Sequence, residues 1–236
     1  MDRVVEIGVP FFEVGPKAYM FGSDALHVAM HADAAGLKYD VQVIVDPQYV
    51  DIPRIAPYMK RALVFAQHMD PVVQGRGQGS VLAEALKAAG AAGAILNHVE
   101  RRQSTEELAR AVGRAEAAGL ASMVCTDDLE QAVAAAALEP TIIVVESPDL
   151  IGSGGGTAAG DRRGAIAECN RAIWKINPGI RVLHGAAIGG AEDVYKVIAA
   201  GAQGTGSSSA IFTATDPAAM VESMVKAVRE AWDATH

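Results

Sequence analysis

The stretch Gly90–Arg102, GAAGAILNHVERR, runs from small residues through a short apolar segment into an amide, an imidazole and a carboxylate. Small residues suit a tight turn, and "GAIL" is an apolar run of strand length. A strand that only fills a core has no use for Asn97, His98 and Glu100 at its tip. The stretch therefore predicts either a buried strand that delivers reactive groups or one that simply ends in solvated polar residues.

The rest of the chain repeats this pattern of a short Val/Ile/Leu-rich run followed by a longer alanine-rich segment with helical spacing. The strands are expected at 4–11, 40–46, 62–68, 93–98, 121–127, 141–147, 181–187 and 204–210. Helical segments between them include 80–90, 104–119, 129–137, 165–177 and 191–201. Eight strands alternating with helices predict an α/β fold, a (β/α)₈ barrel formed by residues 1–236 as one domain. The rival is a doubly wound open sheet, and its dinucleotide form is disfavoured because no GxGxxG follows the first strand.

Two helix boundaries are marked clearly in the sequence. Ser104-Thr-Glu-Glu has the spacing of a capping box, and Gly119 is a stop signal for the same helix. The segment from Ala191 carries acidic residues in its first turn and stops at Gly201, as the helix dipole favours.

Composition restricts the class of protein. The chain of 236 residues has a formal net charge of −8, which argues against a nucleic-acid partner and against an anionic membrane surface. No apolar run reaches the length of about 20 residues that a membrane-spanning helix needs, and the N-terminus has no signal-peptide pattern. Cys125 and Cys169 lack metal or redox spacing and are expected to be small buried residues. A soluble, reduced cytoplasmic enzyme fits these features.

In a barrel, reactive groups gather where the strands end, because the βα loops form the active-site face. The expected strands end at Lys17, at His68, at Asn97 and His98, and at Glu146, and two small-residue loops follow the last two strands. A carboxylate can remove a proton next to a carbonyl, an imidazole can polarise that carbonyl, and a lysine can stabilise the resulting charge. Small loops let backbone N–H groups approach a phosphate. The set predicts proton transfer on a phosphorylated sugar with no metal or organic cofactor.

These motifs, in this order, resemble the triosephosphate isomerase family, and specifically its short archaeal-type branch. The resemblance covers most of the chain. It rests on "VFAQHMDP", "AGAAGAILNHVERR", "RAEAAGLASMVCTDD", "VVESPDLIGSG" and "GAAIGGAEDVYKVIAAGAQG". It implies a TIM barrel that interconverts dihydroxyacetone phosphate and glyceraldehyde 3-phosphate through an enediolate, in glycolysis and gluconeogenesis. It also implies a homodimer or a homotetramer.

The resemblance assigns roles to particular residues. Glu146 is expected to be the catalytic base, His98 the electrophile and Lys17 the charge-stabilising lysine. Glu100 and Asn97 are expected to lie behind the catalytic residues, with Glu100 able to pair with the lysine. The lid is expected to begin after Glu146 and to close over the substrate. The phosphate-binding positions implied by the resemblance are Gly152, Gly189, Ser208 and Ser209.

The sequence also departs from the family pattern. Strand one ends in Gly15-Pro16-Lys17, where the family has Asn-Phe-Lys, and Val99 and Ser147 replace a usual serine and proline. Losing the asparagine deletes a hydrogen-bond donor and is expected to free space beside the carbonyl. Two alternatives therefore stay open: an isomerase of a related ketose phosphate such as erythrulose phosphate, and a non-catalytic barrel that binds a sugar phosphate. His68, His184 and Cys125 are interpreted as structural.

Overall fold

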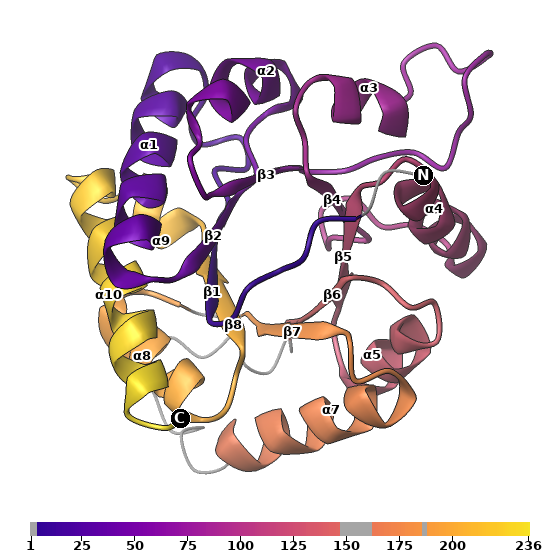
Figure 1. Cartoon of the computed structure of the whole chain (residues 1–236). Helices are drawn as coiled ribbons and strands as arrows, with labels where there is room; N and C mark the ends of the chain where they lie inside the picture. The colour runs from indigo at the N-terminus through magenta and orange to yellow at the C-terminus, as the bar shows by residue number, and fades with distance from the viewer. Residues whose placement is uncertain (1–3, 147–161, 186–187) are drawn as a thin grey trace.

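A computed structural model describes residues 4–146, 162–185 and 188–236. Eight parallel strands close into a barrel in the order β1 to β8, and helices surround it (Figure 1). The strands are β1 Phe11–Val14, β2 Gln42–Val45, β3 Leu63–Ala66, β4 Gly93–Leu96, β5 Ala121–Thr126, β6 Ile142–Val145, β7 Arg181–His184 and β8 Gly204–Ser207. The predicted (β/α)₈ barrel is confirmed.

The helices pack outside the barrel and cover it. They are α1 Gly22–Tyr39, α2 Ile52–Ile55, α3 Ala83–Ala88, α4 Thr105–Ala117, α5 Leu129–Ala136, α7 Arg162–Ile176, α8 Ala191–Ala199, α9 Ser209–Phe212 and α10 Pro217–Asp233, with 3₁₀ turns η1 Tyr49–Asp51 and η2 Ala56–Tyr58. The capping box of α4 is present, with the N–H of Glu107 donating to Ser104 Oγ. Gly119 and Gly201 have positive φ angles of 69° and 107°, so both helix stops are confirmed.

Alternate strand residues serve two separate cores, because side chains along a strand point to opposite faces. On β1, Phe11 joins the cluster inside the barrel, whereas Phe12 and Val14 join the larger cluster between the strands and the helices. On β2, Ile44 points inward in the same way. This alternation decides which residues near the strand ends can face the site.

The prediction of a first strand at 4–11 is wrong, because β1 begins at Phe11. Residues 4–10 cross the N-terminal end of the barrel instead, as the indigo trace in Figure 1 shows. Ile7 is 1% exposed and belongs to the cluster inside the barrel, and its carbonyl accepts from Arg181 Nε at 3.0 Å. The apolar residues 4–10, which the sequence pattern predicted to be a strand, therefore close the N-terminal end of the barrel. The eighth strand is also shorter than expected, since α9 begins at Ser209.

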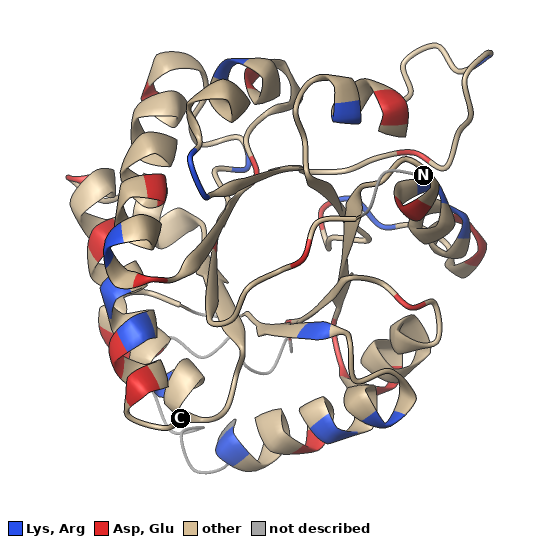
Figure 2. Ribbon diagram, viewed as in Figure 1, with Lys and Arg blue, Asp and Glu red and all other residues tan. Residues whose placement is uncertain are grey.

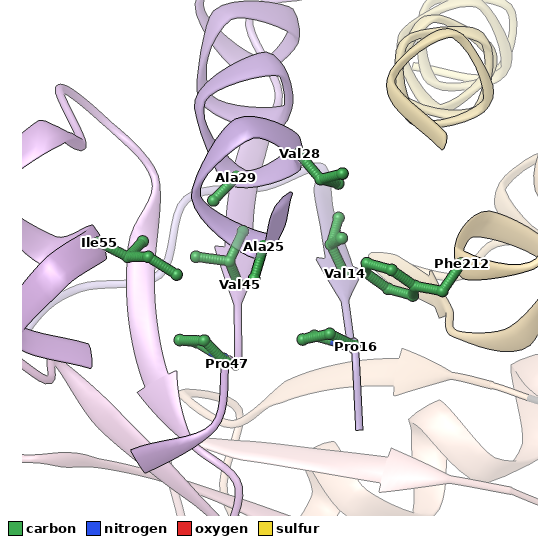
Figure 3. A pocket seen from close by; sticks show the side chains of 9 residues that line it. All are labelled: Val14, Pro16, Ala25, Val28, Ala29, Val45, Pro47, Ile55 and Phe212. Carbon is green, nitrogen blue, oxygen red and sulfur yellow. The ribbon is translucent and has the colours of Figure 1, made fainter. Parts of the chain in front are cut away.

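Charged residues lie mainly on the outer helices, and the barrel strands carry few of them (Figure 2). In the part of the chain described here, no helix is both long and apolar enough to cross a membrane. A small apolar cavity lies between β1, β2 and α1 (Figure 3), and its volume of ≈ 10 Å³ is close to that of a single water site. Since the residues that line it all have apolar side chains, this cavity contributes to packing and lies outside the barrel interior.

Candidate active site

The lysine predicted at the end of β1 has a strained backbone that neighbouring glutamines hold in place. Lys17 has φ 46°, a left-handed value that few residues other than glycine adopt. Its carbonyl accepts from Gln48 Nε2 at 2.5 Å and from Gln67 Nε2 at 3.0 Å. Its Nζ lies 2.7 Å from Glu100 Oε1. The structure thus brings together Lys17 and Glu100, the pair that the sequence predicted.

The imidazole of His98 follows β4 and faces the same group of residues. Its Nδ1 accepts the backbone N–H of Glu100 at 3.2 Å, so in the neutral tautomer the proton is on Nε2. Burial lowers the pKa of His98, and the neighbouring charge of Lys17 acts in the same direction, against that of Glu146. His98 is therefore a neutral hydrogen-bond donor at neutral pH.

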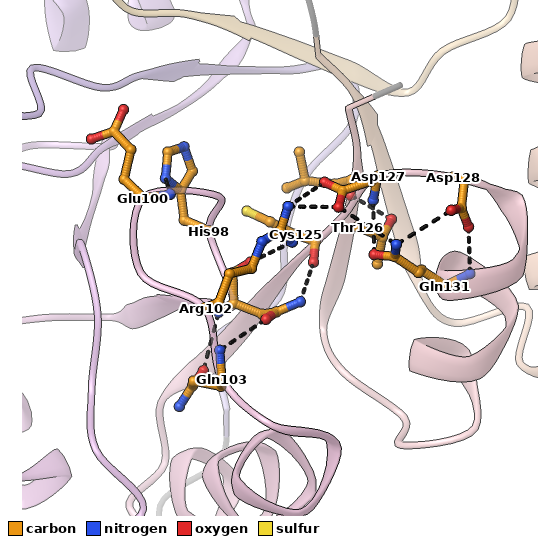
Figure 4. Close-up of polar contacts among 11 residues, drawn as sticks. His98, Glu100, Arg102, Gln103, Cys125, Thr126, Asp127, Asp128 and Gln131 are labelled. Carbon is orange, nitrogen blue, oxygen red and sulfur yellow. Dashed lines mark hydrogen bonds and ion pairs between the residues drawn. The ribbon is translucent and has the colours of Figure 1, made fainter. Parts of the chain in front are cut away.

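Asn97 has a different place from its neighbours, because its side chain points back into the β4–α4 loop. Asn97 Nδ2 donates to the Cys125 carbonyl at 3.0 Å, and its Oδ1 accepts from the N–H of Gln103 at 3.1 Å. Its φ of 59° is again left-handed. Arg102 Nη2 lies 2.6 Å from both carboxylate oxygens of Asp127 (Figure 4). This network fixes the loop that carries His98.

Glu146 comes directly after β6, and its side chain lies over the backbone of β7. Its N–H donates to the Thr126 carbonyl at 2.8 Å. A Cβ placed on Gly185 would be 3.0 Å from Glu146 Cγ and 3.1 Å from Oε1. The charge of Glu146 also influences the pKa values of Lys17 and His98. Lys17, His98 and Glu146 therefore belong to one electrostatic cluster at the mouth of the barrel.

The four predicted phosphate-binding positions differ in whether the structure describes them and in the partners that they contact. Gly152 lies outside the described residues, as does the lid that follows Glu146. The N–H of Gly189 donates to Asp193 Oδ2 at 2.9 Å. Ser208 Oγ donates to the Gly15 carbonyl at 2.5 Å, and Ser209 begins α9. Gly189, Ser208 and Ser209 thus follow β7 and β8, on the same side of the barrel as Glu146.

Two carboxyl groups of the site were missed by sequence reasoning. Glu13 and Asp46 point into the barrel from β1 and from the end of β2, beside Gly15. A Cβ on Gly15 would be 2.4 Å from Glu13 Oε1. The expectation that the missing Asn side chain frees space is therefore wrong, because the Glu13 carboxyl fills it. The unusual stretch "FFEVGP" was the available signal.

The residues interpreted as structural lie away from this cluster or are buried beneath it. His68 Nε2 is 3.1 Å from Asp70 Oδ1, and His184 Nε2 is 2.8 Å from Asn170 Oδ1. Burial lowers the pKa of His184 to about 4, and it raises the pKa of the Cys125 thiol. In residues 4–146, 162–185 and 188–236, no three His, Cys, Asp or Glu side chains group in the way a metal site requires.

Named proteins are similar to this chain over most of its length. The chain is 35% identical over 224 residues to the triosephosphate isomerase of Methanosarcina acetivorans, covering 94% of this chain and 100% of the relative. It is 36% identical over 219 residues to that of Methanobacterium bryantii, covering 92% and 95%.

The crystal structure of triosephosphate isomerase from Bartonella henselae matches the fold with a TM-score of 0.73 at 20% identity, covering 94% of this chain and 100% of that one. The sequence profile of the family described as triosephosphate isomerase matches residues 16–225, which include Lys17, His98 and Glu146. The chain belongs to the triosephosphate isomerase family, as the profile match and the archaeal relatives show.

Proposed function

We propose that this protein interconverts dihydroxyacetone phosphate and glyceraldehyde 3-phosphate, with Glu146, His98 and Lys17 as its catalytic residues. The observation that carries the proposal is the meeting of a carboxylate, a neutral imidazole and a lysine at the carboxyl ends of β6, β4 and β1. The relatives named triosephosphate isomerase match this chain over nearly their whole length.

The proposed reaction moves one proton between adjacent carbons. Glu146 takes a proton from C1 of dihydroxyacetone phosphate while the Nε2–H of His98 donates to the carbonyl oxygen at C2. The charge that develops on the enediolate lies near the ammonium of Lys17. Glu146 then returns its proton to C2, and His98 recovers a proton from the hydroxyl of the former C1 carbon, which becomes the aldehyde. The protein ends the cycle in the state in which it began.

We place the phosphate beside the loops that follow β7 and β8. The N–H groups of Gly189, Ser208 and Ser209 are the proposed donors there, with Gly152 joining them from the lid. Since the N–H of Gly189 donates to Asp193 here, the phosphate would replace a carboxylate that already occupies an anion-binding position. The lid after Glu146 is proposed to close over the phosphate and exclude water.

The related ketose-phosphate isomerase is not favoured by the site. That alternative depended on space left by the absent side chain at Gly15, and Glu13 occupies this space. The non-catalytic barrel is not favoured either, because a pure binder has no need for Glu146.

We further propose that the chain is one domain, acts in the cytoplasm and assembles as a homodimer or a homotetramer. Cys125 and Cys169 are both buried thiols without a disulfide, which suits a reducing compartment. The resemblance to archaeal members supports the assembly, and size-exclusion chromatography with light scattering would distinguish two copies from four.

The function is tested by assaying the purified protein with dihydroxyacetone phosphate and, in parallel, with D- and L-erythrulose phosphates. Fast turnover of the three-carbon substrate is expected. Glu146→Asp withdraws the carboxylate by one methylene and should slow kcat by about 10²-fold or more with little change in KM. Weak triose turnover beside strong four-carbon turnover would contradict the proposed substrate, and an unchanged rate in Glu146→Asp would contradict the base assignment.

A further inference from the structure

A pair of carboxyl groups lies at the inner wall of the barrel, where the proposed reaction gives it no role. Glu13 is on β1, and Asp46 is the first residue after β2. The β1–β2 register pairs Glu13 with Ile44 and Val14 with Val45, so that Gly15 comes level with Asp46. Because Phe11 and Ile44 point inward, strand alternation makes Glu13 and Asp46 point inward too.

Two glycines make room for the head of Glu13. A Cβ on Gly15 would lie 2.4 Å from Glu13 Oε1, and a Cβ on Gly206 would lie 2.2 Å from Glu13 Oε2. Neither glycine has a positive φ in the left-handed region, so the backbone does not require glycine at either place. Their absent side chains are what allow a carboxyl group to sit between β1 and β8.

Asp46 is 3% exposed, and its Oδ1 is buried with no hydrogen-bond partner among the described residues. Both of its carboxyl oxygens lie 3.3 Å from the Cβ position of Gly15 and so point toward Glu13. Neither Glu13 nor Asp46 takes part in a salt bridge within the described chain, and the nearby Lys17 is paired with Glu100. A buried oxygen without a donor is costly in a folded protein, which indicates that the carboxyl pair holds a proton between its members. Glu13 is only partly buried and is the member that a ligand can reach.

The pair retains a proton at neutral pH. Burial raises the pKa of Glu13 to about 7, and the charge of Glu146 adds to this, whereas hydrogen bonding to Asp46 and the charge of Lys17 oppose it. Burial and the charge of Glu13 raise the pKa of Asp46 well above its usual range. The thiol of Cys125 is the remaining titratable neighbour, and burial raises its pKa too. The two side chains therefore offer one O–H donor together with carboxyl acceptors.

We propose that Glu13 and Asp46 form a hydroxyl-binding subsite that holds the uncharged end of the sugar phosphate, opposite its phosphate group. A sugar hydroxyl is both a donor and an acceptor, and so is a carboxyl pair that shares one proton. A phosphate dianion is repelled by the same pair, which orients the substrate with its hydroxyl end toward β1 and β2. This subsite rests on the proposed function and supplies a polar contact beside Gly15.

The test measures inhibition constants for two unreactive polyol phosphates. Glycerol 3-phosphate carries the terminal hydroxyl, and 2-hydroxypropyl phosphate lacks only that group. The wild-type protein is expected to bind glycerol 3-phosphate about tenfold or more tightly, as one hydrogen bond to a charged or shared-proton carboxyl provides. In Glu13→Leu this preference should disappear, whereas Glu13→Gln, whose amide has both a donor and an acceptor, should keep most of it.

Two further variants make the result interpretable. Asp33→Asn changes another buried carboxyl, one that accepts backbone N–H bonds from Lys60, Arg61 and Ala62 far from the site, and should leave the preference unchanged. If Glu13→Leu does not fold, Gly15→Ala provides the same test, because its new Cβ displaces the Glu13 oxygen while keeping both carboxyl groups.

Three outcomes overturn the subsite. One is a preference for glycerol 3-phosphate that persists in Glu13→Leu, and another is no preference in the wild-type protein. The third is a Mg²⁺-dependent rise in the melting temperature of the wild type but not of Glu13→Leu, which would make the pair a cation site. Normal triose turnover without a Glu13-dependent preference refutes the subsite alone. A Glu13-dependent preference without triose turnover refutes the proposed function and leaves the subsite in place.

Discussion

Replacing Lys17 with methionine separates catalysis from stability. The Nζ of Lys17 lies 2.7 Å from Glu100 Oε1, but the two side chains are 35% and 62% exposed. Such a solvent-exposed pair contributes about 0.2–1 kcal/mol to folding. In the proposed reaction the ammonium also faces the enediolate. A unit charge about 4 Å away, at an effective dielectric constant of about 20, contributes about 4 kcal/mol.

The expected result is therefore a large kinetic effect with a small thermal one. Lys17→Met should lower kcat/KM for dihydroxyacetone phosphate by about 10³-fold, the rate equivalent of about 4 kcal/mol. Its melting temperature should change by only a few degrees. A coupled assay gives the rates, and differential scanning calorimetry gives the melting temperatures.

Lys38→Met is the matched control. Lys38 Nζ also lies 2.7 Å from a glutamate, Glu222, and these side chains are 61% and 47% exposed on α1 and α10. It should lose as little stability as Lys17→Met and keep full activity. The reasoning is refuted if Lys17→Met retains kcat/KM within tenfold of the wild-type value. A much larger loss of melting temperature than in Lys38→Met would instead give Lys17 a role in folding.

Three further predictions concern residues around the barrel. Because burial lowers the pKa of His184 to about 4, the folded state binds fewer protons than the unfolded state between pH 4 and about 6.5, and stability falls as the pH drops through this range. Urea titrations should show a loss of about 2 kcal/mol from pH 7 to pH 5 that His184→Gln abolishes; an equal loss in the variant would point to other groups. Ser104→Ala removes the oxygen that accepts from the N–H of Glu107 and should cost about 1 kcal/mol in the same titrations, whereas no change would mean that the cap is unimportant. Arg102→Lys cannot contact both oxygens of Asp127 and should lower kcat about tenfold with little change in melting temperature, and unchanged kinetics would show that the loop carrying His98 needs no such support.

The fold was predictable where local signals agree with the tertiary structure. The capping box at Ser104 and the stops at Gly119 and Gly201 act within a few residues, and all three were read correctly. The first strand was misplaced because residues 4–10 are apolar like a strand. Their role at the end of the barrel depends on contacts such as Ile7 with the inner core, which no local pattern reveals.

The candidate site also contains residues that could be predicted from the sequence and one that could not. Lys17, His98 and Glu146 come shortly after the ends of β1, β4 and β6. Parallel strands bring their carboxyl ends together, so the meeting of these residues could be predicted. For Glu13 the unusual stretch FFEVGP was the only signal, and it did not show the direction of the side chain, because an acidic residue inside a short strand usually faces solvent. Its inward position depends on Gly206, a residue at the opposite end of the chain that only barrel closure brings beside it.

The closed N-terminal end of the barrel has a consequence for the transfer of deuterium from substrate to product. Ile7 is packed into that end as part of the inner cluster, and the proposed reaction takes place at the opposite end, where Glu146 follows β6. In the proposed reaction, a hydrogen taken up by Glu146 is expected to exchange with bulk water slowly while the enediolate is bound. Deuterium placed on the substrate should then persist in the product to an extent set by the competition between solvent entry and product departure. The packing at the N-terminal end of the barrel thus influences how much deuterium the product of a reaction at the other end retains.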